Sequence, residues 1–234
     1  MGSEKTLRPS DCWVVVPAYN EKDAIGEVLD ELLAKGYNVA VVDDGSSDGT
    51  FDEAAKRPVH LLRHIVNLGQ GAALQTGVEY ALRQGASYVV TMDADGQHCV
   101  EDIALLVEPL LDGAYDIALG TTRFRRRLLG QRMPRLRRWT LIVAAFFSRV
   151  HPGLKVTDAH NGLRAMSRQA ASKLNIMHNG MAHATEMLDF IKHERLRWRE
   201  VDVSIKYTRY SLSKGQHISN SFNIIWDWML GKVR

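Results

Sequence analysis

Hydrophobic residues in the first half of the chain form short runs that alternate with segments of helical spacing. The apolar runs indicate buried strands at 13–16, 39–42, 60–62, 88–92 and 116–120. Apolar positions that repeat every three or four residues predict helices at 25–33, 69–84 and 103–111. Strands that alternate with helices in this way predict a mostly parallel, open α/β sheet flanked by helices.

The second half of the chain has a less regular pattern. Its spacing predicts helices at 132–150, 183–193 and 218–230, a half-buried strand at 201–205 and a polar loop at 207–216. No internal repeat, low-complexity stretch or linker interrupts it. We therefore expect one domain over residues 1–234, with residues 1–12 as a flexible N-terminus.

Polar, motif-like loops directly follow three of the predicted strands. They occupy residues 17–21, 43–50 and 93–98. In open α/β sheets, ligands bind beyond the carboxyl ends of the strands. The three loops should therefore gather at one edge of the sheet and form a site there.

The loop at 93–98 carries the strongest chemical signal. Asp93 and Asp95 are two residues apart, so in extended backbone their carboxylates point the same way. Two crowded carboxylates repel each other and favour a cation between them. Oxygen ligands without a nearby cysteine favour Mg²⁺ or Mn²⁺ over zinc, and a cation held by few protein oxygens keeps positions for phosphates. This pattern predicts a metal–diphosphate site.

The other loops also have purely structural explanations. Pro17 ends a strand ladder, and Glu21 lies near a helix N-terminus, where a carboxylate is favoured in any case. The turn residues of 43–50, with Ser47 or Asp48 as a helix cap, explain most of that loop. Yet Asp43 and Asp44 are two adjacent acids, more than a turn requires, and one of them can accept hydrogen bonds from a base or a ribose. Residues 67–71 are only a weak glycine-rich turn, because no Gly-Lys-Ser/Thr follows.

Charge is concentrated in one segment although the net charge is only +3. Eight arginines fall within 123–138: Arg123, Arg125, Arg126, Arg127, Arg132, Arg135, Arg137 and Arg138. The segment is either a solvated face or, as we favour, a membrane-surface element with Trp139, Phe146 and Phe147 in the interface. Nucleic acid ranks low because no recognised nucleic-acid motif accompanies the arginines.

Cysteine content and hydropathy indicate the compartment. Two cysteines do not make a disulfide framework, which favours a reducing cytoplasm. The longest apolar run, 141–147, is shorter than the roughly 20 residues that span a bilayer. No signal peptide is visible. We expect a cytoplasmic protein, peripheral on the cytoplasmic face of the membrane.

The order and spacing of the motifs as a set resemble one known family. Val-Pro-Ala-Tyr-Asn-Glu at 16–21, Asp-Asp-Gly-Ser-Ser-Asp-Gly-Thr at 43–50, Asn-Leu-Gly at 67–69 and Asp-Ala-Asp-Gly-Gln at 93–97 closely resemble glycosyltransferase family two, enzymes of the GT-A fold. The segments at 120–123, 157–158, 161–164 and 213–215 are similar to those of dolichyl- and polyprenyl-phosphate sugar synthases. One departure is Asn161-Gly162-Leu163-Arg164, where the family commonly has Ser-Gly-Phe-Arg.

The resemblance implies roles for individual residues. The residues that would line the nucleoside pocket are Pro17, Tyr19, Glu21, Val42 and Asp44. Those that would hold the metal, Mg²⁺ or Mn²⁺, and the ribose and diphosphate are Asp93, Ala94, Asp95 and Gln97, with Asp93, Asp95 and Gln97 as the metal ligands. Arg123 and Lys214 would meet phosphate charge, and Arg164 is a candidate for the same task. Residues 13–122 would bind the nucleotide sugar, and 123–234 would face the acceptor and the membrane.

The expected reaction is a metal-dependent, inverting transfer of a sugar from a GDP- or UDP-linked donor to a polyprenyl phosphate. The catalytic residues would be Asp95, Arg123, Arg164 and Glu186. A polyprenyl phosphate is already anionic and needs no general base, whereas a glycan or other hydroxyl acceptor does. For that base Glu186 and Asp158 are the candidates, although Glu186 reads equally well as part of a solvated helix face.

The sequence also allows other roles for two histidines and other functions for the chain. His98 and His183 are expected to be polar surface residues rather than ligands. A non-catalytic module that binds a nucleotide sugar is the alternative from another class. A nucleotidyltransferase would need a glycine-rich N-terminal loop, which the sequence lacks.

Overall fold

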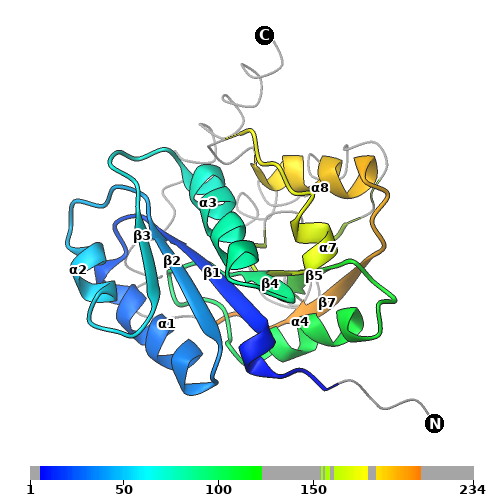
Figure 1. Ribbon diagram of the computed structural model, residues 1–234, viewed down its shortest axis with the longest axis horizontal. Helices are drawn as coiled ribbons and strands as arrows, with labels where there is room; N and C mark the ends of the chain where they lie inside the picture. The colour runs from blue at the N-terminus through cyan, green and yellow to red at the C-terminus, as the bar shows by residue number, and fades with distance from the viewer. Residues whose placement is uncertain (1–5, 123–153, 155, 159–160, 179–182, 207–234) are drawn as a thin grey trace, which may run out of the picture.

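The sheet is the centre of the computed structural model, which describes residues 6–122, 154, 156–158, 161–178 and 183–206. Its strands run in the order β3-β2-β1-β4-β6-β5-β7 (Figure 1). Their bounds are Cys12–Ala18 for β1, Asn38–Asp43 for β2, His60–Arg63 for β3, Tyr88–Thr91 for β4, Ile117–Thr122 for β5, Arg164–Ser167 for β6 and Trp198–Val203 for β7. All the strand pairs are parallel except those of β6, which is antiparallel to β4 and β5.

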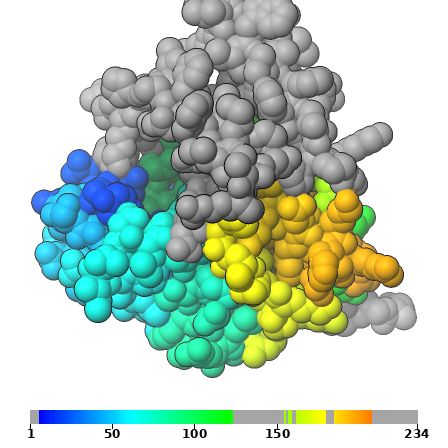
Figure 2. Space-filling view, turned by 90° about the horizontal axis from the view of Figure 1, so that it is seen from above, coloured from blue at the N-terminus to red at the C-terminus, as the bar shows by residue number. Residues whose placement is uncertain are grey.

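Helices cover both faces of this sheet and make three layers. Their bounds are Lys22–Ala34 for α1, Thr50–Ala54 for α2, Gln70–Arg83 for α3, Asp102–Leu111 for α4, Arg168–Ala171 for α7 and His183–His193 for α8, and a short 3-10 turn, η1, spans Pro9–Asp11. Apolar residues of α1, α2 and α4 pack on one face, and those of α3, α7 and α8 on the other. Seen from above, the cyan residues of α3 lie beside the yellow residues that follow β6 (Figure 2).

Alternating side chains of the central strands supply the two cores. Val14 and Val16 of β1 face α1 and α4, whereas Val15 faces α3. All three are fully buried. Successive residues of a strand point to opposite faces, so a strand covered on both sides reads as a continuous apolar run.

Most of the predicted elements of the first half are confirmed, as is the mostly parallel α/β architecture. Strand β1 continues through Pro17, which pairs with Val42, to Ala18, so the prediction that Pro17 ends the ladder is wrong. In the second half α8 is confirmed, and the strand expected at 201–205 begins earlier, at Trp198. The elements predicted at 132–150, 207–216 and 218–230 lie outside the described residues.

Strand β6 was not predicted, and it matters for the site. It inserts between β4 and β5, in the middle of the sheet, and pairs Arg164 with Thr91. Thr91 is the last residue of β4 and Asp93 follows two positions later. The antiparallel strand therefore carries an arginine from the second half of the chain to the place where the acidic loop begins.

Candidate active site

The first two motif loops are joined by hydrogen bonds at the carboxyl edge of the sheet. Asn20 has a φ of 54°. Its amide donates to Oγ of Ser46 (3.0 Å), and its Oδ1 accepts from the amide of Ser47 (3.0 Å). The amide of Glu21 donates to Oγ1 of Thr50 (2.8 Å). The Asn-Glu and Ser-Ser motifs therefore hold each other in place, whatever they also do for a ligand.

Asp44, expected in the nucleoside pocket, is buried and already accepts several hydrogen bonds. Its Oδ1 lies 2.7 Å from Nδ1 of His64 and accepts from the amide of Leu68 (3.0 Å), and its Oδ2 accepts from the amide of Gly69 (2.7 Å). Asp44 thereby fixes the turn that leads into α3. Pro17 and Val42 lie near the ends of β1 and β2, and Tyr19 directly follows β1.

Asp93 of the acidic loop is held by residues from three segments. Its Oδ1 accepts from Nε2 of Gln70, at the start of α3 (2.9 Å). Its Oδ2 lies 3.1 Å from Nε2 of His98. A Cβ on Gly162 would overlap this carboxylate, so the backbone at 162 lies directly against it. These contacts orient Asp93 before any ligand arrives.

His98 corrects one of the sequence-based expectations. It is 5% exposed and bonded to Asp93, not a surface residue. Burial lowers the pKa of His98, but the hydrogen bond to Asp93 and the charges of Asp93, Asp95 and Asp158 outweigh this effect and raise it. The acidic surroundings therefore favour the imidazolium form.

Arg164 is 3% exposed and lies within electrostatic reach of two carboxylates. Burial lowers the pKa of its guanidinium, and the charges of Asp93 and Asp158 act in the opposite direction. Asp158 also accepts a hydrogen bond from Oγ1 of Thr122 (3.1 Å). A buried charge without a counter-charge is costly, so Arg164 and these two aspartates stabilise one another.

Asp95, like Asp93, is only partly exposed. Its Oδ1 accepts from the amide of Gln97 (3.0 Å). Burial raises the pKa of the Asp95 carboxyl, and the charges of Asp93 and Glu21 add to this rise. Ala94, between the two aspartates, is buried in the core. A carboxylate that is destabilised by neighbouring acids gains from a cation beside it.

The oxygens of Asp93, Asp95 and Gln97 fit a hard divalent cation. All are carboxylate or amide oxygens, the ligands that Mg²⁺ and Mn²⁺ prefer. Within the described ranges, no group of three or more His, Cys, Asp and Glu residues is arranged to hold a metal ion. A cation here would therefore depend on few protein ligands and on oxygens of the donor.

Of the other predicted site residues, Glu186 has backbone partners of its own, and Arg123 and Lys214 lie outside the described residues. Glu186 accepts hydrogen bonds from the amides of Met177 (2.7 Å) and His178 (2.9 Å). It therefore anchors the segment before α8. Like Arg123 and Lys214, the side chain of His183 lies outside the described part of the structure.

Sequence reasoning missed Gln70, Gly162 and the burial of His98. Gln70 lies in the weak glycine-rich turn at 67–71, and His98 lies directly after the Asp-Ala-Asp-Gly-Gln motif. Gly162 belongs to the Asn-Gly-Leu-Arg segment, so its position in a motif was the available signal. Their contacts with Asp93 depend on the strand order, which a single sequence does not give.

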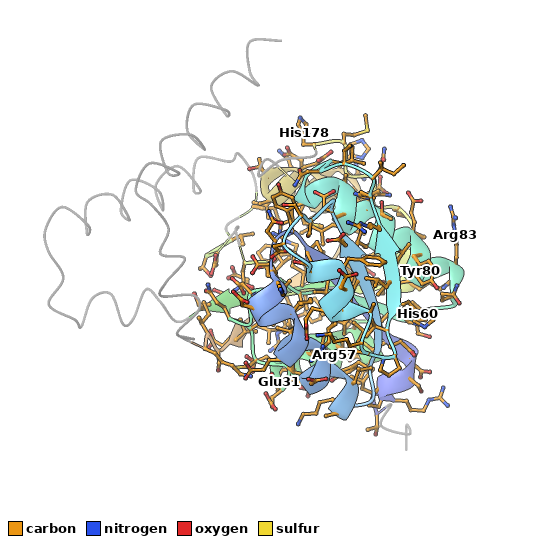
Figure 3. All side chains as sticks on the ribbon, turned by 90° about the vertical axis from the view of Figure 1, so that its left-hand side faces the viewer. Glu31, Arg57, His60, Tyr80, Arg83 and His178 are labelled. Atoms are coloured by element: carbon orange, nitrogen blue, oxygen red, sulfur yellow. The ribbon has the colours of Figure 1, made fainter. Side chains whose placement is uncertain are left out.

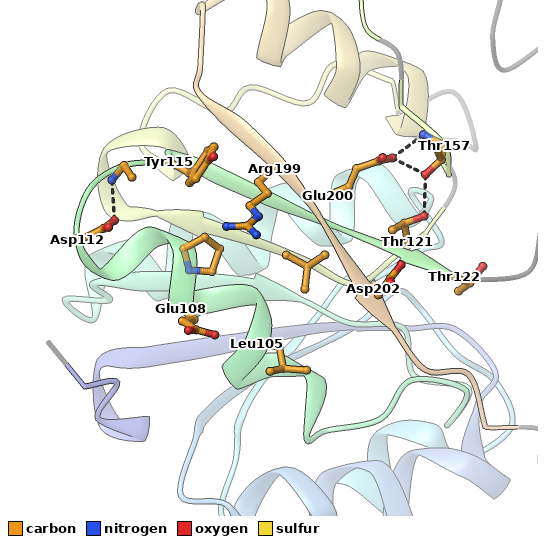
Figure 4. Close-up of a pocket in the computed structure, with 13 residues that line it drawn as sticks. Leu105, Glu108, Asp112, Tyr115, Thr121, Thr122, Thr157, Arg199, Glu200 and Asp202 are labelled. Atoms are coloured by element: carbon orange, nitrogen blue, oxygen red, sulfur yellow. Dashed lines mark hydrogen bonds between the residues drawn. The ribbon is translucent and has the colours of Figure 1, made fainter. Parts of the chain in front are cut away.

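A pocket of about 840 Å³ lies away from the acidic loop, over the α4 side of β5 and β7 (Figure 4). Leu105, Tyr115, Arg199 and Asp202 are among its lining residues. At its rim, Oγ1 of Thr157 donates to Glu200 (2.7 Å). None of the predicted site residues that the structure describes is among its lining residues.

Comparison with known proteins decides the family. The profile described as "Glycosyl transferase family 2" matches residues 13–174. The chain belongs to this family. It is a glycosyltransferase, and the predicted resemblance is confirmed.

Relatives with similar sequences cover nearly the whole chain. An uncharacterized protein of Methanocaldococcus jannaschii is 36% identical over 97% of this chain and 94% of its own. The UDP-N-acetylglucosamine–dolichyl-phosphate N-acetylglucosaminyltransferase of Methanococcus voltae is 30% identical, over 94% and 96%. The polyprenol monophosphomannose synthase of Mycolicibacterium smegmatis is 29% identical, over 95% and 89%.

A solved structure of similar fold confirms the GT-A prediction. Glucosyl-3-phosphoglycerate synthase from Mycobacterium tuberculosis, in complex with Mn²⁺, UDP and glucosyl-3-phosphoglycerate, superposes with a TM-score of 0.62. The two chains are 20% identical, over 87% of this chain and 74% of the other. No helix in the described part of this family 2 glycosyltransferase has the length and hydrophobicity that crossing a bilayer requires.

Proposed function

We propose that this glycosyltransferase moves a sugar from a nucleoside-diphosphate sugar to a polyprenyl phosphate in a single displacement that inverts the anomeric centre. The observation that carries the proposal is the orientation of Asp93 by Gln70, His98 and Gly162 at the carboxyl edge of the sheet. The name of one relative states a dolichyl phosphate, and that of another states a polyprenol monophosphomannose, which supports the acceptor class.

Asp93, Asp95 and Gln97 would hold Mg²⁺ or Mn²⁺ together with the diphosphate. A bound divalent cation neutralises the charge that builds up on the departing nucleoside diphosphate. Arg164 acts from the core, because its charge balances Asp93 and Asp158 and keeps the acidic loop in one arrangement. We propose direct phosphate contacts for Arg123 and Lys214 and retain Arg164 as a candidate for such a contact.

The donor's nucleoside would lie against Pro17, Tyr19, Glu21 and Val42, with Asp44 fixing the neighbouring turn. Tyr19 is 48% exposed at the end of β1 and offers an aromatic face to a base. Residues 13–122 would supply the donor side, and 123–234 the acceptor side of a single domain. The two named relatives differ in the sugar they transfer, so either UDP- or GDP-linked donors agree with this arrangement.

A phosphate acceptor agrees with the position of the candidate bases. Glu186 is engaged by two backbone amides. Asp158 is the one candidate within electrostatic reach of His98 and Arg164. With a glycan or another hydroxyl acceptor, the second candidate function, Asp158 would be the general base. With a polyprenyl phosphate, the acceptor oxygen needs no base.

Exposed apolar side chains support an encounter with a membrane at the same edge. Tyr19, Ile65, Val66 and Leu68 lie on loops that follow β1 and β3, and Ile65 is fully exposed. Met177, 72% exposed, precedes His178, whose carbonyl lies against Gly71 at the start of α3. We propose that this edge meets the cytoplasmic face of a membrane, where a polyprenyl phosphate presents its head group.

The proposal is tested by following a labelled sugar. The protein is incubated with labelled UDP- and GDP-sugars, a membrane lipid extract and Mn²⁺, and the product is extracted into organic solvent. A lipid product that releases the sugar in mild acid supports the phosphate acceptor. Label in a water-soluble glycan supports the hydroxyl acceptor, and the absence of turnover with every donor supports a non-catalytic binding module.

A further inference from the structure

The segment that follows β7 lies along the acidic loop and is fastened to it at several points. The amide of Lys206 donates to the carbonyl oxygen of Gln97 (2.7 Å). Ile205 and His98 form an antiparallel β-bridge. The amide of Ser204 donates to Oδ2 of Asp102 (2.6 Å), a buried carboxylate in the first turn of α4. Three consecutive residues thus pair with the end of the loop and with the first turn of α4.

The far end of this segment is anchored on a different element. Nζ of Lys206 lies 2.8 Å and 2.6 Å from the two carboxylate oxygens of Glu31 on α1. The side chains of this ion pair are 35% and 36% exposed. Burial lowers the pKa of Lys206, but the hydrogen bond to Glu31 and its charge outweigh this and raise it. The amine therefore stays charged and tied to α1.

We propose that residues 204–206 form a positioning strap for the acidic loop and that the Lys206–Glu31 ion pair is its anchor. The loop is held on its inner side by Gln70 and Gly162, which contact Asp93. The strap holds the outer side through the backbone at 97 and 98. Both sides are needed to fix Asp95 relative to Asp93, because Asp95 lies between Asp93 and the strapped residues Gln97 and His98.

The consequence for function is a change in cation affinity, which rests on the proposed role of the loop. Groups that orient metal ligands without touching the metal commonly change metal affinity when they are lost. Lys206 and Glu31 are positioning residues in this sense, since they act through the loop backbone. Releasing the anchor should loosen residues 93–102 and weaken the binding of Mn²⁺.

Hydrogen–deuterium exchange tests the strap without reference to activity. In Lys206→Met and in Glu31→Gln, amides of a peptide spanning 93–102 should exchange about fivefold faster. This factor corresponds to about 1 kcal/mol, the upper end of what a partly exposed ion pair contributes to stability. The double variant with Glu31→Lys and Lys206→Glu restores an ion pair and should return exchange toward the wild-type rate. Unchanged exchange in both single variants would overturn the proposal.

A neighbouring ion pair on the same helix provides the matched control. Asp30 pairs with Arg57, with both oxygens at 2.8 Å from guanidinium nitrogens, and does not reach the loop. Figure 3 shows Glu31 and Arg57 close together at the same end of the molecule. Asp30→Asn should leave exchange in 93–102 unchanged, and an equal acceleration there would show a general effect of destabilising α1 and refute the strap.

Titration with Mn²⁺ in the presence of UDP or GDP, read by electron paramagnetic resonance, tests the functional part. The dissociation constant should rise about fivefold in Lys206→Met and recover in the double variant. Faster exchange with unchanged Mn²⁺ affinity would reduce the strap to a structural feature and contradict a positioning role. Wild-type protein that binds no Mn²⁺ would refute the proposed function instead, and exchange would still decide whether the strap holds the loop.

Discussion

The backbone of Gly162 lies so close to the carboxylate of Asp93 that a Cβ at position 162 would overlap its oxygens. The carbonyl of Gly162 accepts a hydrogen bond from Oγ1 of Thr91 (2.8 Å), which fixes this approach. A glycine in the second half of the chain therefore sets the position of an aspartate 69 residues earlier in the sequence. This contact gives a physical reason for glycine in the Asn-Gly-Leu-Arg segment.

Gly162→Ala should displace Asp93 and lower glycosyl transfer by about tenfold or more, as the loss of a group that orients a metal ligand does. The measurement is the initial rate at saturating donor, together with the Mn²⁺ concentration that gives half of the maximal rate. Gly26→Ala is the control, because its Cβ would meet the flexible ends of the Arg57 and Glu53 side chains and not the acidic loop. Equal rates for wild type and Gly162→Ala would refute the positioning of Asp93.

Arg164→Met should destabilise the fold. It leaves the partly exposed Asp93 and Asp158 without this buried counter-charge. Removing one partner of a fully buried pair costs about 3–5 kcal/mol, and the exposure of the aspartates should reduce the loss here to about 1–3 kcal/mol. Urea denaturation followed by circular dichroism measures the free energy of unfolding. Arg164→Lys keeps the charge and should retain part of this stability. If Arg164→Met is as stable as the wild type, the guanidinium does not balance these carboxylates.

Asp95→Asn should stabilise the metal-free protein at neutral pH. The pKa of Asp95 is raised in the folded protein by burial and by the charges of Asp93 and Glu21, so its ionised form is disfavoured relative to the unfolded chain. The resulting loss of stability is absent below the pKa of the unfolded chain, about 3.9, grows as pH rises above that value, and is complete above the folded pKa. Urea unfolding in EDTA at pH 4 and pH 7 should therefore show a larger gain for Asp95→Asn at pH 7. An equal gain in the free energy of unfolding at pH 4 and pH 7 would mean that ionisation of Asp95 does not destabilise the fold.

Ile65→Asp should weaken binding to lipid vesicles about tenfold. Removing one large apolar side chain from a membrane contact forfeits about 1.5 kcal/mol or more. The experiment is co-sedimentation with vesicles of mixed neutral and anionic lipids. Leu105→Asp is the matched control, since Leu105 is 48% exposed on α4, in the pocket away from this edge. Equal losses of vesicle binding in both variants would contradict a membrane contact at the carboxyl edge.

The sequence predicted the parts of this molecule whose signals are local. Apolar runs marked β1, β2 and β4, and the acids directly after them marked the edge where the site forms. Strand β6 was not predicted, because the segment Arg164-Ala165-Met166-Ser167 is short and begins with a charged residue. Neither the spacing of its apolar residues nor its hydropathy indicates a central strand. The burial of Arg164 follows from its pairing with β4 and could not be read from its neighbours in sequence.

The partners of the candidate residues were harder to predict than the residues themselves. Asp93 was found from its spacing to Asp95, but Gln70 is 23 residues away in sequence and reaches it only because α3 begins at the same edge. His98 was expected at the surface because histidine is polar, whereas the strap at 204–206 and Asp93 enclose it. Glu186 was a candidate base by residue type, and its bonds to Met177 and His178 show a structural role.

Binding of Mn²⁺ to wild type and to Asp95→Ala, with and without UDP or GDP, tests the central claim most directly. Electron paramagnetic resonance of free Mn²⁺ gives the affinity. We predict that wild type binds Mn²⁺ more tightly when a nucleoside diphosphate is present, and that Asp95→Ala loses this binding together with sugar transfer. Equal Mn²⁺ affinity and full transfer in Asp95→Ala would contradict the assignment of the acidic loop as the cation and diphosphate site.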